Sequence, residues 1–107
     1  MVEELTPETV QAKLNESDLQ VVDIRSPQAF EQGHIPGAIN VPLAEFPRRV
    51  GEHDWDDEIV VVCPIGQSSI QGARLLQSFE GVDDDAAVAS MAGGYEQWEG
   101  ELETGDR

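Results

Sequence analysis

The sequence predicts an α/β fold in which helices cover a largely parallel sheet. Apolar runs rich in β-branched residues, at 19–24, 58–62 and 86–91, indicate buried strands. Segments with helical spacing lie between these runs, and the connections are short. Strands that alternate with helices across short loops are typical of parallel α/β sheets.

The first quarter of the chain contains two helices around one strand. Residues 6–9 (Thr-Pro-Glu-Thr) predict a helix start, with Thr as the N-cap, Pro at the first helical position and an acid in the first turn. Residues 15–18 end that helix before the strand at 19–24. Ser26 then caps a short helix, which Gly33 ends.

The next segment contains a very short strand at 38–41 and helical turns at 43–50. Arg48 and Arg49, in these turns, form the only adjacent basic pair. This pair is equally consistent with a docking point for an acidic partner and with a solvated helix face. Trp55 lies in a polar connection, where we expect it to cover the core and not to bind a ligand.

The central strand ends at Cys63, the only cysteine in the chain. Pro64 and Gly66 force a turn, and we expect Ser68 and Ser69 to cap the helix at 70–79. The thiol is therefore predicted at the carboxyl end of a buried strand, facing a helix N-terminus. Parallel sheets bind ligands at this edge, and helix N-termini stabilise anions and thiolates there.

The last part of the chain continues the same alternation. An acidic turn at 81–85 precedes the final strand, and a flexible break at 92–94 follows it. Within this break, Gly93 and Gly94 are expected to form a tight turn near the rim of the pocket. A last helix is expected to start at 95–98 and to end at Gly100. Residues 101–107 are expected to be frayed.

Composition limits the class of protein. No apolar run approaches the ~18 residues of a membrane span, and the start at Met1 lacks the features of a signal peptide. We therefore expect a cytoplasmic protein. A single cysteine excludes an internal disulfide, and together with His34 and His53 it forms no metal-ligand pattern. No metal or cofactor is expected.

The charge is strongly negative, because six basic residues face 22 acidic ones for a net charge of −16. This argues against nucleic acid or an anionic membrane as a partner. The acids alternate with apolar segments, which favours a folded domain with an acidic shell over disorder. Lys13 is the only lysine. We expect a halophilic source, since dissolved ions would screen the repulsion, with an ordinary acidic protein as the alternative.

Four blocks in order resemble the single-domain rhodaneses, a family of sulfurtransferases. The blocks are 21–25 (VVDIR), 30–40 (FEQGHIPGAIN), 61–69 around Cys63, and 92–98 (AGGYEQW). The resemblance covers about residues 4–99 and places one domain over 1–107, with an acidic tail at 100–107. It implies a three-layer α/β/α fold with a five-stranded parallel sheet. It also implies that Cys63 carries sulfane sulfur as a persulfide held by loop amides.

Such chemistry requires a nucleophilic cysteine and donors that stabilise a persulfide anion. The resemblance implies that the sulfur comes from a small sulfur compound, either thiosulfate or a persulfide. The sulfur acceptor is then a thiophilic molecule, for which a sulfur-carrier protein is one candidate. Glycine lets the backbone approach the sulfur, and the two serines add hydroxyl donors. The substrate-binding loop is expected to comprise Pro64, Ile65, Gly66, Gln67, Ser68 and Ser69, of which only Pro64 lacks an N–H.

The sequence departs from the family pattern at one place. Rhodaneses that use thiosulfate commonly have an arginine five residues after the cysteine, where this chain has Ser68. The loop carries no charge, so we expect weak thiosulfate activity and regard a persulfide as an alternative donor. The missing guanidinium also argues against the related phosphatases and arsenate reductases.

Three further residues are expected to support the site. Asp23 and Arg25 are expected to form an ion pair that braces the loop, and Arg25 is the better candidate to face the pocket. His34 is either a general base or, as we favour, a residue bonded to the backbone. Cys63 itself has a structural alternative as a buried thiol. The alternative function is a non-catalytic rhodanese-like module that binds a partner or senses oxidants.

Overall fold

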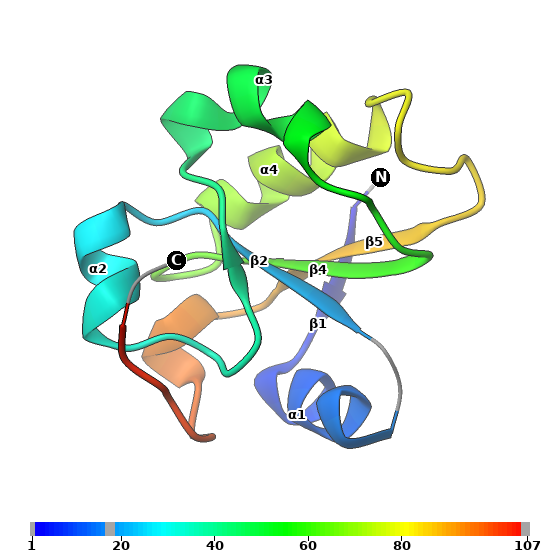
Figure 1. The fold of residues 1–107 in the computed structure, drawn as a ribbon. Helices are drawn as coiled ribbons and strands as arrows, with labels where there is room; N and C mark the ends of the chain where they lie inside the picture. The colour runs from blue at the N-terminus through cyan, green and yellow to red at the C-terminus, as the bar shows by residue number, and fades with distance from the viewer. Residues whose placement is uncertain (1, 17–18, 106–107) are drawn as a thin grey trace.

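The structure is a computed structural model that describes residues 2–16 and 19–105, and it confirms the three-layer α/β/α arrangement (Figure 1). Five strands form one sheet in the order β1-β5-β4-β2-β3, and every neighbouring pair is parallel. The strands are β1 (Glu3–Leu5), β2 (Gln20–Asp23), β3 (Ile39–Asn40), β4 (Glu58–Val62) and β5 (Ala87–Met91).

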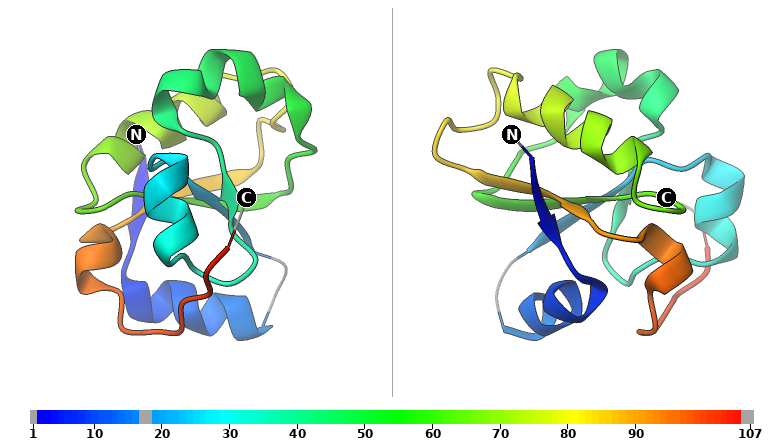
Figure 2. Two further views of the ribbon diagram at one scale, coloured as in Figure 1. Left: turned by 60° about the vertical axis from the view of Figure 1, so that its left-hand side comes forward. Right: turned by 180° about the vertical axis from the view of Figure 1, so that it is seen from behind.

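The helices lie on both faces of the sheet. They are α1 (Pro7–Glu16), α2 (Pro27–Gln32), α3 (Phe46–Arg49) and α4 (Ser68–Gln77), with 3₁₀ turns η1 (Leu43–Glu45), η2 (Val50–Glu52) and η3 (Gly94–Gln97). The views in Figures 1 and 2 agree that α3 and α4 cover one face, while α1 and η3 cover the other. Thr6 and Ser26 are confirmed as caps, because their hydroxyls accept the N–H groups of Thr9 and Ala29 at 3.2 Å.

Strand β4 is buried on both sides, as its continuous apolar sequence predicts. Its residues alternate between two core clusters, because successive side chains of a strand point to opposite faces. Val60 and Val62 belong to the cluster with Val10 of α1, whereas Val61 and Cys63 belong to the cluster with Leu76 of α4. The cysteine is therefore directed toward the α4 layer by the period of the strand.

Strand β1 was not predicted from the sequence. It pairs with β5 from Glu3 to Leu5, with Glu3 opposite Ala89 and Leu5 opposite Met91. Two of its three residues are exposed glutamates. An edge strand requires only backbone pairing on one side, so this segment shows neither the apolar run nor the alternation that indicates a strand.

The expectation of a frayed C-terminal tail is wrong for its described part. The N–H of Glu103 donates to the carbonyl of His34 at 2.8 Å, and the reverse bond measures 2.9 Å. The N–H of Gly105 donates to the carbonyl of Glu31 at 3.0 Å. This backbone pairing orders an otherwise polar segment. Residues 17–18, where the first helix was expected to end, and 106–107 lie outside the described residues.

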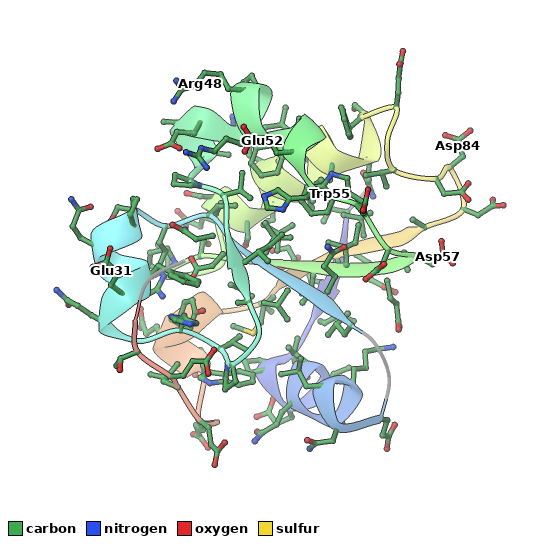
Figure 3. The ribbon with its side chains drawn as sticks, in the orientation of Figure 1. Glu31, Arg48, Glu52, Trp55, Asp57 and Asp84 are labelled. Atoms are coloured by element: carbon green, nitrogen blue, oxygen red, sulfur yellow. The ribbon has the colours of Figure 1, made fainter. Side chains whose placement is uncertain are left out.

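Figure 3 shows three acidic residues of the surface and the partly buried Trp55. Glu31, Asp57 and Asp84 point outward from three different parts of the fold and are exposed. Trp55 packs against the α4-side core, and its indole N–H donates to the carbonyl of Val50 at 2.8 Å, which confirms its covering role. Within residues 2–16 and 19–105, every helix is too short or too polar to cross a bilayer.

We predict that Asn40→Ala destabilises the fold by roughly 1–3 kcal/mol. The buried Asn40 amide donates to the carbonyls of Asp23 and Arg25, both at 3.0 Å, and its removal leaves these acceptors without that donor. Urea unfolding measures the change. Asn15→Ala, at an exposed position of α1, is the control and should shift stability by less than about 0.5 kcal/mol. Equal effects of the two variants would contradict this account of Asn40.

Candidate active site

The candidate site lies where the carboxyl ends of three adjacent strands meet. Because the sheet is parallel, the segments that follow β2, β4 and β5 emerge at the same edge. The segment after β4 contains Cys63 and leads directly into α4. In Figure 1 this loop lies at the left end of β4, between α2 and the beginning of α4.

The sulfur of Cys63 is surrounded by hydrogen-bond donors. The residue is 1% exposed. Its Sγ accepts the N–H of Gly66 at 3.1 Å and the N–H of Ser69 at 3.3 Å, and lies 3.3 Å from the Ser69 hydroxyl. The loop therefore directs partial positive charge at the sulfur, although it carries no formal charge.

Ser69 does not have the capping role expected from the sequence. Helix α4 begins at Ser68, its N-cap is Gln67, and no side chain caps it. Ser69 is buried and turned toward the sulfur, and its hydroxyl lies 2.6 Å from the hydroxyl of Ser90 on β5. The sequence reasoning missed Ser90, although a single serine inside an otherwise apolar buried strand was a signal for it.

Ser69 and Ser90 form a buried pair of hydroxyls beside the sulfur. Their oxygens lie 2.6 Å apart, and either hydroxyl can be the donor. A hydroxyl both donates and accepts, so Ser69 can donate to an anionic sulfur 3.3 Å away while it accepts from Ser90.

The loop has donors beyond those that contact the thiol. Within the described residues, the N–H groups of Ile65, Gln67 and Ser68 have no acceptor. Unpaired N–H groups at the start of a helix form a binding site for an anion. The loop thus contains three unpaired N–H groups in addition to the two that contact the sulfur.

The turn after β5 is hydrogen-bonded to the cysteine loop and holds it in place. The N–H groups of Tyr95 and Glu96 donate to the carbonyls of Cys63 and Pro64, at 2.9 and 3.0 Å. This contact has no space for a side chain, because a Cβ on Gly94 would lie 2.2 Å from the Cys63 carbonyl oxygen. Gly94 also has a φ of +59°, so Gly93 and Gly94 form the tight turn expected from the sequence.

Asp23 and Arg25 form the expected ion pair beside this turn. The guanidinium donates to both carboxylate oxygens of the buried Asp23, and its Nη2 also donates to the Gly33 carbonyl at 2.7 Å. Burial opposes the charged form of Arg25, but the hydrogen bond and charge of Asp23 outweigh it and raise the pKa of Arg25. The ion pair therefore joins the end of β2 to the end of α2, with the charge of each partner balanced by the other.

Tyr95 connects this ion pair to the cysteine loop. Its hydroxyl donates to Asp23 Oδ2 at 2.9 Å and accepts the N–H of Ile35 at 3.0 Å, while the Arg25 guanidinium lies 3.8 Å above its ring centre. Burial, followed by the charge of Asp23, raises the pKa of Tyr95 well above its usual value, so the phenol remains a donor. Its place in the 92–98 block was a signal, but the residue type alone assigned it no role.

His34 occupies a structural position. The ring stacks on Phe30 with 3.6 Å between centroids, and its Nδ1 lies 2.6 Å from the Phe30 carbonyl. Its Nε2 lies 3.4 Å from a Glu103 carboxylate oxygen. Both nitrogens therefore have partners away from the sulfur. Arg74, the nearest arginine downstream of the loop, is exposed on α4, and the described residues contain no cluster suited to a metal ion.

The fold and site define a cysteine-centred parallel α/β domain, and comparisons with known proteins identify its family. The model of the rhodanese-like domain matches residues 6–101. The chain therefore belongs to the rhodanese-like domain family. It is similar to the thiosulfate sulfurtransferase GlpE of Pseudomonas syringae, with 39% identity over 88% of this chain and 84% of that protein. The GlpE of Pseudoalteromonas translucida is 37% identical over 80% of this chain and 78% of that protein.

Other relatives are longer or more distant. YrkF of Bacillus subtilis is 30% identical over 95% of this chain, which spans only 54% of YrkF. A solved thiosulfate sulfurtransferase of Pseudomonas aeruginosa is 30% identical with a TM-score of 0.76, covering 98% of this chain and 21% of that one. A rhodanese-related protein of Thermoplasma volcanium superposes with a TM-score of 0.81 at 18% identity, over 96% of this chain and 99% of that one, which supports the fold.

We predict that Gly94→Ala destabilises the protein by roughly 3 kcal/mol, because left-handed backbone strain adds to the clash with the Cys63 carbonyl. Gly37→Ala is the matched control, since Gly37 also has positive φ, +84°, but a Cβ there meets nothing within 4 Å. The control should lose only about 1 kcal/mol in urea unfolding. If both variants lose the same amount, the close packing of the two loops is not the constraint.

Proposed function

We propose that this protein is a sulfurtransferase in which Cys63 alternates between a thiol and a persulfide. The observation that carries the proposal is the ring of donors around Cys63 Sγ, with further unpaired amides at the loop. In the first step the thiolate attacks the outer sulfur of a donor such as thiosulfate, forming Cys63–S–S⁻ and releasing sulfite. In the second step a thiophilic acceptor attacks the outer sulfur, and the Cys63 thiolate leaves.

The loop supplies what each state of the sulfur requires. The amides of Gly66 and Ser69 hydrogen-bond the inner sulfur, and those of Ile65, Gln67 and Ser68 are available for the outer one. Both steps pass through a negatively charged sulfur, which fixed dipoles stabilise without reorganisation. No second thiol takes part, which agrees with a single cysteine.

The names of the GlpE relatives support thiosulfate as one donor, while the loop argues for low activity with it. Thiosulfate is a dianion, and the loop from Pro64 to Ser69 carries no charge on a chain of net charge −16. The persulfide group of an uncharged thiol carries a single negative charge and is repelled less by this surface. We therefore propose a persulfide as the preferred donor.

We predict that incubation with thiosulfate or polysulfide adds one sulfur to the intact protein. Mass spectrometry should show this gain in the wild type and its loss after treatment with dithiothreitol or cyanide. Cys63→Ser should show no gain. If no donor loads the wild-type chain, the enzyme proposal fails, and a binding or redox-sensing role takes its place.

We further predict that Ser68→Arg raises kcat/KM for thiosulfate roughly tenfold, because a hydrogen bond to a charged group contributes about 1.5–3 kcal/mol. Ser68 is exposed at the first turn of α4, beside the unpaired amides. Gln77→Arg adds the same charge at the exposed far end of α4 and should change kcat/KM by less than about twofold. Equal gains would show that net charge, and not the place of the guanidinium, limits thiosulfate use.

A further inference from the structure

An apolar groove lies between α3 and α4, on the opposite side of the sheet from α1. It is a cavity of about 220 Å³ lined by Phe46, Pro47, Val50, Leu75, Ser78 and Phe79. None of these six side chains carries a charge. The other described cavities include acidic residues such as Asp57, Glu101 and Asp83 in their walls. This groove therefore differs in chemistry from the rest of the acidic surface.

Exposed apolar side chains are concentrated near the same helix. The exposed large hydrophobic residues are Ile65, Leu75 and Leu102. Ile65, 51% exposed, lies in the cysteine loop, and Leu75, 40% exposed, lies on the helix that this loop begins. Leu75 lines the groove, so one of these exposed apolar side chains belongs to it, as expected for a binding surface on an otherwise polar molecule.

The charge near the groove also differs from that of the whole chain. Residues 43–52 and 68–79 contain three arginines and two glutamates, whereas the remaining sequence contains three basic and 20 acidic residues. Arg49 is paired with Glu45 and Glu52. Arg48 and Arg74 are exposed, and Figure 3 shows Arg48 on α3 directed away from the body of the protein. Arg48 and Arg74 are direct sequence neighbours of the lining residues Pro47 and Leu75, so an acidic partner complements the charge of these two segments.

The size and position of the groove favour a protein over a small molecule. Pockets for drug-sized ligands usually measure about 300–1,000 Å³, so 220 Å³ suits one large apolar side chain. Leu75 follows Ser68 by seven residues, which is about 10 Å along the helix axis. A partner anchored over Leu75 therefore reaches the cysteine loop with a short extended segment.

We propose that the α3–α4 groove docks the protein partner of sulfur transfer, an acidic protein that inserts one apolar side chain flanked by carboxylates. The inference rests on the proposed function for its transfer step, but not for its binding step. Docking places a thiol of the partner over the loop. That thiolate attacks the outer sulfur of Cys63–S–S⁻; the bond to Cys63 breaks, a new S–S bond forms on the partner, and the Cys63 thiolate leaves.

The binding test uses a synthetic peptide with glutamates on both sides of one phenylalanine and a Gly-Gly-Gly-Cys tail, which spans at most about 14 Å. In an NMR titration of the full chain at about 0.15 M salt, backbone signals of Val50, Leu75 and Phe79 should shift. A peptide with serine in place of phenylalanine should bind at least roughly tenfold more weakly, since the buried anchor dominates such contacts.

Matched charge variants test the role of the arginines. Arg48→Gln with Arg74→Gln should weaken peptide binding roughly fivefold or more. Gln28→Glu with Gln32→Glu, both exposed on α2, lowers the net charge by the same amount and should have less than about a twofold effect. Shifts that map outside the groove, or equal effects of the two double variants, would overturn the proposal. Self-association through Val50, Leu75 and Phe79 without peptide would also overturn it, by assigning the groove to a second copy.

The transfer step is measured separately by mass spectrometry with Cys63 loaded beforehand. Sulfur should pass to the phenylalanine peptide at least roughly tenfold faster than to the serine peptide, and the arginine variants should load normally but transfer more slowly. If the wild type never loads, the proposed function fails while the binding result still decides the docking site. If it loads but both peptides react equally, the docking proposal fails and the proposed function stands.

Discussion

The contact between the cysteine loop and the turn after β5 is the constraint on which the site depends. Two backbone hydrogen bonds, from Tyr95 and Glu96 to the carbonyls of Cys63 and Pro64, join segments that lie about 30 residues apart. They hold the loop in the conformation in which the N–H groups of Gly66 and Ser69 point at the sulfur. Gly94 permits this contact because a side chain there would collide with the Cys63 carbonyl. Tyr95 is held in place by its hydrogen bond to Asp23, which is paired with Arg25.

Positive potential at the sulfur arises here from dipoles instead of charges. Backbone amides and two buried hydroxyls supply it, and the guanidinium of Arg25 is already neutralised by Asp23. Dipoles act over short range, so this site discriminates by fit around the sulfur more than by long-range attraction of an anion. An acidic surface then suppresses encounters with anions in general, and a partner must be attracted to a particular face.

Sequence reasoning was reliable where one strong local pattern determined the structure. The buried strand before Cys63, the caps at Thr6 and Ser26 and the cover formed by Trp55 follow from such patterns. It failed where tertiary contacts outweigh local preference. Ser69 resembles a cap in sequence but turns inward, because Ser90 and the sulfur offer it partners. β1 and the tail have few apolar residues, and their order comes from backbone pairing with segments distant in sequence.

The pairing of β1 with β5 has a consequence for how the chain folds. Strand β1 has only β5 as its sheet neighbour, and the segment around Glu103 pairs with His34. Both contacts join segments that are far apart in sequence, so neither forms before its later segment, β5 or the one around Glu103, has left the ribosome. Loop closure over such separations slows folding. The cysteine loop, which requires the turn after β5, is therefore completed only when the segment up to Glu96 is available.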